Sequence, residues 1–137
     1  MATVLVVDDE FGIVDVLETI LTDDGYRVLT ACNGKQGLVR LSEEKPEVIL
    51  LDFMMPILGG GDLLRAMAAE PEYQRIPVIM MSSLREQAVA ERCEGYAAFL
   101  HKPFRAAAVV STVARVLGAQ TTGASPAPEP IGGPLRS

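Results

Sequence analysis

The chain has 137 residues, of which 49 % are hydrophobic and 22 % charged, and its formal net charge is -6. This length suits one domain, and the apolar content is high enough to build a core rather than a disordered chain. The acidic charge argues against direct binding to nucleic acid or to an anionic membrane surface, because clusters of Lys and Arg hold both.

Sorting signals are not evident in the sequence. No stretch is apolar over the length of a bilayer span, and residues Met1 to Val4 lack the basic and apolar segments of a signal peptide. We therefore expect a cytoplasmic chain with no membrane partner. There, Cys32 and Cys93 are expected to be free, largely buried thiols, since their spacing does not resemble a metal site.

Short apolar segments alternate with segments of helical pattern five times along the chain. Strands are predicted at residues 4–7, 27–31, 48–51, 77–81 and 97–100. Helices are predicted at residues 11–24, about 34–44, about 60–69, about 84–93 and 105–117. In the first helix, Ile13, Leu17 and Leu21 recur at the three-and-four spacing of one helix face.

The strand segments predict how these elements pack. Residues 48–51 are apolar without alternation, which is typical of a strand covered on both faces. Right-handed crossovers then give an α/β fold, with a doubly wound five-stranded parallel sheet and five helices. Gly118 is predicted to end the last helix, so the domain is predicted to span residues 1–118. The Pro-, Ala- and Gly-rich residues 119–137 are predicted to form a disordered tail.

Polar side chains follow four of the predicted strands at their carboxyl ends, where ligands bind in this fold class. They are Asp8-Asp9-Glu10, Asp52, Ser82-Ser83 and His101-Lys102-Pro103. Carboxylates that converge repel one another unless a cation intervenes, and oxygen ligands with room for water suit Mg²⁺. A carboxylate beside Mg²⁺ can attack phosphorus, while Lys102 and the Ser82 hydroxyl can each meet an oxygen of the transferring group. The sequence therefore predicts a site for phosphoryl transfer.

Four segments resemble motifs of the response-regulator receiver domain, the CheY-like domain of two-component signalling. They are residues 6–10, 51–56, 77–83 and 99–104, in the order and spacing of the family, and the resemblance covers about residues 3–118. It implies the flavodoxin-like strand order 2-1-3-4-5. It also implies a phosphorylation-activated switch rather than an enzyme, because such a domain promotes only its own phosphorylation and dephosphorylation.

The resemblance assigns the metal site and the phosphoryl acceptor. Asp52 matches the phosphorylated aspartate. Asp9 matches a direct Mg²⁺ ligand, and Asp8 matches the acid that acts mainly through a metal-bound water. Met54 matches the position whose backbone carbonyl completes the metal site.

The resemblance also assigns the residues of the switch. Lys102 matches the lysine that pairs with the phosphoryl group, and Ser82 matches the hydroxyl that turns toward it. Phe99 matches the aromatic side chain that moves inward as Ser82 turns. Pro103 stands where the family often has a cis peptide bond, a conformation that is realistic only before proline.

The partners implied are proteins. The phosphoryl donor would be a sensor histidine kinase or a phosphotransfer protein of a phosphorelay. The face formed by the fourth helix, fifth strand and fifth helix would bind an unidentified downstream protein. The sequence leaves open whether the domain forms a dimer on phosphorylation. The sequence does not decide whether the domain stands alone or belongs to a longer protein.

The same residues have simpler structural interpretations, and two rival functions compete with phosphoryl transfer. Asp8 and Asp9 could cap the following helix, and Lys102 could be an ordinary surface lysine. A flavodoxin-like electron carrier would need a Ser-, Thr- and Gly-rich loop after the first strand, where acids would repel a flavin phosphate. A degenerate receiver that only binds proteins is disfavoured because Asp9, Asp52 and Lys102 are all present.

Overall fold

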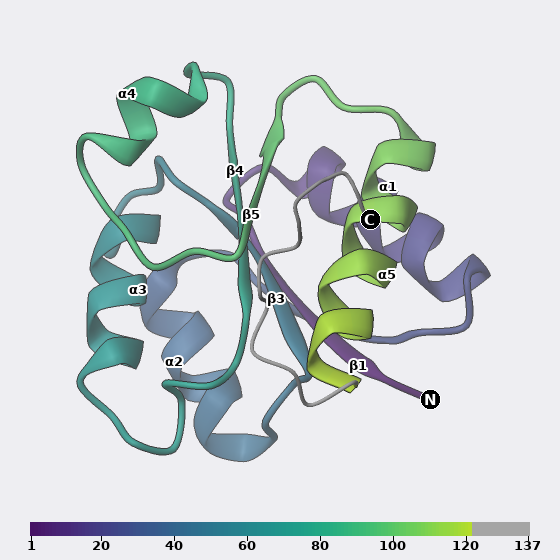
Figure 1. Cartoon of the computed structure of the whole chain (residues 1–137), viewed down its shortest axis with the longest axis horizontal. Coiled ribbons are helices and arrows are strands. Elements are labelled where there is room, and N and C mark those ends of the chain that lie inside the picture. The colour runs from purple at the N-terminus through teal and green to yellow at the C-terminus, as the bar shows by residue number, and fades with distance from the viewer. Residues whose placement is uncertain (122–137) are drawn as a thin grey trace.

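The computed structural model describes residues 1–121, in which five strands alternate with five helices (Figure 1). The strands are β1 (Thr3–Val7), β2 (Arg27–Ala31), β3 (Val48–Asp52), β4 (Val78–Ser82) and β5 (Ala98–His101). The helices are α1 (Phe11–Asp23), α2 (Gly34–Glu43), α3 (Gly60–Ala68), α4 (Glu86–Ala90) and α5 (Ala106–Thr121). The strands form one parallel sheet in the order β2-β1-β3-β4-β5, which confirms the predicted fold class and strand order.

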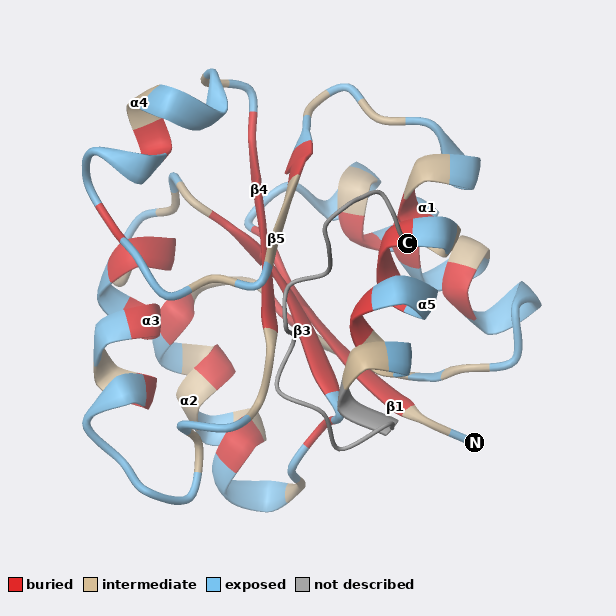
Figure 2. Cartoon of the chain, in the orientation of Figure 1, coloured by how far each residue is buried: buried red, intermediate tan, exposed pale blue. Residues whose placement is uncertain are grey.

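The central strands are buried on both faces, as their continuous apolar sequences predict. Every residue of β1, β3 and β4 is buried (Figure 2). Alternate side chains of one strand enter different cores, so that in β3 Val48 and Leu50 face one helix layer while Ile49 and Leu51 face the other. This burial on both sides is what fixes the strands and leaves only their ends open to solvent.

Two helix layers cover the sheet (Figure 1). Helices α1 and α5 pack on one face through the buried side chains Val14, Leu17, Leu21, Val109, Val113 and Val116. Helices α2, α3 and α4 pack on the other face through side chains that include Leu41, Leu63, Leu64, Met67 and Val89. The first and last helices thus share one layer and the three middle helices the other, and each β–α loop at the carboxyl ends of the strands opens toward the same edge.

Two predicted helices have wrong boundaries. Helix α4 has only the five residues Glu86–Ala90, whereas about residues 84–93 were expected. Its N-cap residue Arg85 offers no side-chain cap, and the residues between β4 and Arg85 form a bend instead of a first helical turn. Helix α5 continues through Gly118 to Thr121, because Gly118 does not adopt the positive φ that would end the helix there. The domain boundary at residue 118 therefore falls inside a helix, and residues 122–137 of the predicted tail lie outside the described residues.

Candidate functional site

The predicted polar residues meet in one cleft at the carboxyl edge of the sheet. The cleft has a volume of about 500 Å³. It is lined by Asp9, Glu10, Ile13, Asp52, Met54, Ser82, Ser83, Lys102 and Pro103. The carboxyl ends of β1, β3, β4 and β5 therefore supply a single site, as the parallel topology requires, although they are far apart in the sequence.

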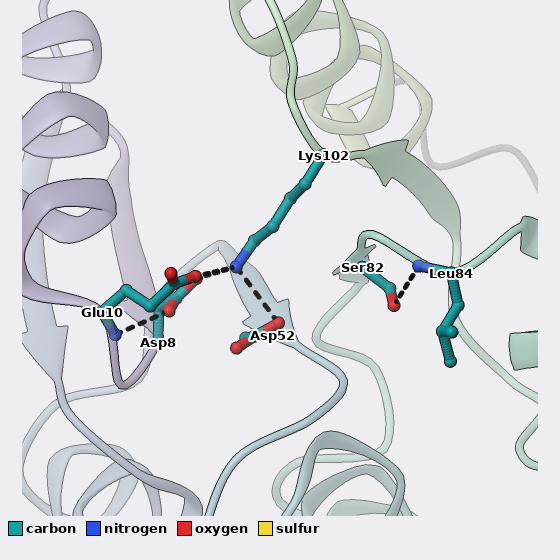
Figure 3. Close-up of polar contacts among 6 residues, drawn as sticks. All are labelled: Asp8, Glu10, Asp52, Ser82, Leu84 and Lys102. Atoms are coloured by element: carbon teal, nitrogen blue, oxygen red, sulfur yellow. Dashed lines mark hydrogen bonds and ion pairs between the residues drawn. The ribbon is translucent and has the colours of Figure 1, made fainter.

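Lys102 is the cation at the centre of this cleft (Figure 3). Its Nζ lies 2.8 Å from Oδ2 of Asp8, 3.1 Å from Oε1 of Glu10 and 3.3 Å from Oδ1 of Asp52. Asp8 is fully buried and Asp52 is 5 % exposed, whereas the Glu10 side chain is 61 % exposed. One ammonium group thus serves three carboxylates, so it cannot neutralise them all.

Burial and this shortage of positive charge together set the protonation of Asp52. Burial raises the pKa of the Asp52 carboxyl from its ordinary value of 3.8 to about 7, and the charge of Asp8 adds to the rise. The charge and hydrogen bond of Lys102 act in the opposite direction but do not cancel it. For Lys102, burial acts to lower the pKa, but the hydrogen bond to Asp8 and the charge of Asp52 raise it overall. Asp52 is therefore partly protonated near neutral pH until more positive charge arrives.

The residues present fit a hard divalent cation. One carboxylate oxygen from each of Asp8, Glu10 and Asp52 lies within 4.8 Å of the others. These are oxygen donors with unbalanced negative charge, which is the chemistry that Mg²⁺ prefers in proteins. Asp9 is exposed and lines the cleft but is not part of this cluster. Glu10 was not predicted to belong to this cluster. Its place as the third acid in the run after β1 was the sequence signal that could have indicated it.

Local hydrogen bonds hold Asp8 at the end of β1. Its backbone N–H donates to the Ala31 carbonyl at 3.1 Å, and its Oδ1 accepts from the Glu10 backbone N–H at 2.9 Å. Glu10 is the N-cap residue of α1 and makes no side-chain cap hydrogen bond. The Asp8 carboxylate thus orders the start of α1 with one oxygen and binds Lys102 with the other, so a capping role alone does not account for it.

The loop after Asp52 is held mainly by close backbone contacts. The Gly34 N–H, at the start of α2, donates to the Leu58 carbonyl at 3.0 Å, and the Gly60 N–H donates to the Phe53 carbonyl at 2.9 Å. A Cβ on Gly34 would overlap the carbonyl oxygen of Leu58. A Cβ on Gly60 would lie 2.5 Å from the carbonyl oxygen of Asp52 itself. Sequence reasoning missed both positioning roles, because they depend on how closely separate segments approach.

The same loop exposes apolar side chains. Met54 is 60 % exposed and lines the cleft, and Ile57 is 73 % exposed. Ile57 also has a φ of 71°, a left-handed conformation that is costly for a β-branched residue. This residue therefore carries backbone strain without burying its side chain within the described part of the chain.

The residues of the expected switch lie on β4 and β5. Ser82 is buried, and its Oγ accepts a hydrogen bond from the Leu84 N–H at 3.0 Å rather than facing Asp52 (Figure 3). The Phe99 ring is partly buried and lies 6.3 Å from the Tyr96 ring, centroid to centroid. The peptide bond between Lys102 and Pro103 is cis, as the resemblance implied.

Comparison with known proteins decides the family. Residues 4–114 match the sequence model of the response regulator receiver domain. This chain belongs to that family. The probable transcriptional regulator ycf27 of Porphyra purpurea is 41 % identical over 92 residues, which are 67 % of this chain and 36 % of the relative. The receiver domain thus spans about a third of the length of that relative.

Solved receiver structures share the fold. The chemotaxis protein CheY4 of Vibrio cholerae is 30 % identical, with a TM-score of 0.78 over 85 % of this chain and 98 % of that one. The receiver domain of the sensor histidine kinase PA1611 from Pseudomonas aeruginosa is 28 % identical, with a TM-score of 0.80 over the same shares of the two chains. That neighbour is described with a magnesium ion coordinated in its active-site cleft. In the present receiver domain, no helix within residues 1–121 is long and apolar enough to cross a membrane.

Proposed function

We propose that this receiver domain is a signalling switch that takes a phosphoryl group from a phosphohistidine onto Asp52. The observation that carries the proposal is the position of Asp52 at the base of the cleft, with Lys102 at 3.3 Å and the acids of the β1–α1 loop beside it. A carboxylate in this place is reachable through the cleft yet shielded from bulk water, as aspartyl phosphate formation requires.

The transfer exchanges one bond to phosphorus for another. An oxygen of the ionised Asp52 carboxylate forms a bond to phosphorus, and the bond between phosphorus and the donor imidazole nitrogen breaks, with its electron pair returning to the imidazole. Lys102 can follow the growing charge on the phosphoryl oxygens, because its ammonium already lies among the acids of the site. The high pKa of Asp52 means that extra positive charge is needed to keep this nucleophile ionised near neutral pH.

A magnesium ion suits that need. Asp9, Asp8, Asp52 and the backbone carbonyl of Met54 would hold it, with Glu10 close enough to join them directly or through water. When bound, Mg²⁺ supplies positive charge that screens the carboxylates and stabilises the charge of the transferring phosphoryl group. The dense acidic cluster around a single lysine is the feature of this chain that supports the assignment.

The signal would leave the site through Ser82 and Phe99. Ser82 Oγ would exchange the Leu84 N–H for an oxygen of the phosphoryl group, and Phe99 would move inward into the space vacated. That movement alters the face formed by α4, β5 and α5, where a downstream protein or a second phosphorylated copy would bind. We propose a sensor histidine kinase or phosphotransfer protein as the donor, and the cytoplasmic location expected from the sequence stays a prediction.

Phosphorylation by acetyl phosphate tests the assignment. With Mg²⁺ present, intact-mass measurement should show the gain of one phosphoryl group, and an excess of EDTA should prevent it. Asp52→Asn should gain none. Asp15→Asn, which changes an exposed aspartate on α1, is the matched control and should label like the wild type. Equal labelling of the Asp52→Asn variant would show that another residue is the acceptor.

A further inference from the structure

A histidine side chain holds the segment that follows β4. His101 is the last residue of β5 and lies beside Ser82 in the parallel register. Its Nε2 lies 3.0 Å from the backbone carbonyl oxygen of Ser83. Since a carbonyl oxygen only accepts, Nε2 must carry the hydrogen in this contact.

This hydrogen bond continues the pairing of β4 and β5 past the end of the strands. The last backbone bond between them runs from the Lys102 N–H to the Ser82 carbonyl at 2.8 Å. The first carbonyl after β4, that of Ser83, accepts from the His101 side chain. The exposed imidazole therefore reaches back over the sheet edge and fixes one residue more than the strand backbone does.

The carbonyl that His101 holds belongs to the same peptide group as the N–H that holds the Ser82 hydroxyl. The Ser83 C=O and the Leu84 N–H are the two polar ends of one planar unit. His101 binds one end of it, and Ser82 Oγ accepts from the other at 3.0 Å. Rotation of this peptide plane is therefore resisted at its carbonyl end by a side chain from another strand.

We propose that His101 is a positioning residue for the Ser82 hydroxyl. By fixing the peptide plane between Ser83 and Leu84, it keeps the Leu84 N–H directed at Ser82 Oγ and so favours the orientation in which the hydroxyl faces away from Asp52. This inference rests on the proposed function, in which Ser82 Oγ must leave the Leu84 N–H to meet the phosphoryl group. Loss of the His101 hydrogen bond then favours the phosphorylated arrangement instead of harming it.

A pair of substitutions isolates the hydrogen bond. The side-chain nitrogen of glutamine lies about as far from the backbone as Nε2 of histidine, while that of asparagine lies about as far as Nδ1 and falls short. His101→Gln therefore keeps a donor at the required reach, and His101→Asn does not. The probe is beryllofluoride, an analogue of the phosphoryl group, titrated with saturating Mg²⁺ and followed by amide NMR signals.

We expect His101→Asn to bind beryllofluoride about three- to tenfold more tightly than the wild type, the range given by one net hydrogen bond. His101→Gln should stay within about twofold of the wild type. Hydrogen exchange of the Leu84 amide should be faster in His101→Asn alone, and the exposed position of His101 should leave both variants folded.

The outcomes separate this inference from the proposed function. Equal or weaker binding by His101→Asn, or a His101→Gln variant that behaves like His101→Asn, would overturn the role of His101 while leaving the switch intact. Failure of the wild type to bind beryllofluoride at all, together with unlabelled Asp52, would overturn the proposed function and the inference with it.

Discussion

Two loops flank the carboxylates of the cleft, and they are positioned by different forces. The β1–α1 loop, residues 8–10, consists of three acids, of which Asp8 and Glu10 are held by hydrogen bonds and by the charge of Lys102. The β3–α3 loop, residues 53–59, carries no charged residue and is held by the close approach of Gly34 and Gly60 to its backbone. The first loop should therefore respond to pH, salt and metal, and the second to changes of side-chain volume.

The largest expected effect is a steric one on the second loop. Gly34→Ala places a Cβ against the Leu58 carbonyl, so either the loop or α2 must shift, and we expect a loss of about 3 kcal/mol of stability. Gly12→Ala is the control, because a Cβ there meets nothing within 4 Å and α1 should gain about 0.5–1 kcal/mol. Denaturant unfolding measures both, and two changes of the same sign would contradict the contrast.

The electrostatic counterpart is the removal of the Asp52 charge. The folded state raises the pKa of this carboxyl to about 7, so ionised Asp52 destabilises the fold when no metal is bound. Below about pH 4 the wild type and Asp52→Asn should be about equally stable. As the pH rises toward 7, the wild type should become less stable than the variant. Above pH 7 the variant should be more stable by about 2 kcal/mol, about half of what roughly three pKa units imply, because solvent in the cleft screens part of the repulsion. Thermal melts in EDTA across this pH range test it, and a pH-independent difference would contradict the raised pKa.

Metal binding should act through the first loop. At a free Mg²⁺ concentration ten times its Kd, ligand linkage should stabilise the wild type by about 1.4 kcal/mol. Asp9→Asn should lose most of that gain. In EDTA the same variant should differ from the wild type by only about 0.5 kcal/mol, because Asp9 is exposed and adds least to the raised pKa of Asp52. A large gain of metal-free stability in Asp9→Asn would place the main repulsion on Asp9 instead of Asp8.

The smallest expected effect concerns the strained residue of the second loop. Asparagine tolerates the left-handed conformation better than isoleucine, and Ile57 buries little that would be lost. Ile57→Asn should therefore raise stability by about 1 kcal/mol without changing Mg²⁺ affinity. Ile57→Val, which keeps the β-branch, should leave stability nearly unchanged. Destabilisation by asparagine would mean that the exposed side chain makes a contact that matters.

The sequence predicted the elements whose burial is uniform or periodic. Strands β3 and β4 and the apolar face of α1 were recognisable, because each apolar pattern shows directly which faces of the element are buried. Helix α4 was overestimated because five residues are too few to show a period. Gly118 misled because a glycine permits a left-handed turn but does not impose one.

The site, too, was predicted in part and missed in part. The strand-end rule gathered Asp8, Asp52, Ser82 and Lys102, although Lys102 and Asp8 lie 94 residues apart. The rule could not show that Glu10 would share the lysine, because this depends on a side-chain rotamer. Nor could it show that Gly34 lies against Leu58 or that His101 reaches Ser83, since both contacts depend on local approach between distant segments.

The contact between Gly34 and Leu58 has a consequence for protein engineering. Loops at the carboxyl ends of strands are the usual units to exchange between related domains when specificity is to be altered. Here the β3–α3 loop rests on the first residue of α2, which belongs to a different β–α unit. A graft of residues 53–59 into another receiver domain would therefore have to bring along a glycine at the position of residue 34, so the transferable module is two separate pieces of chain.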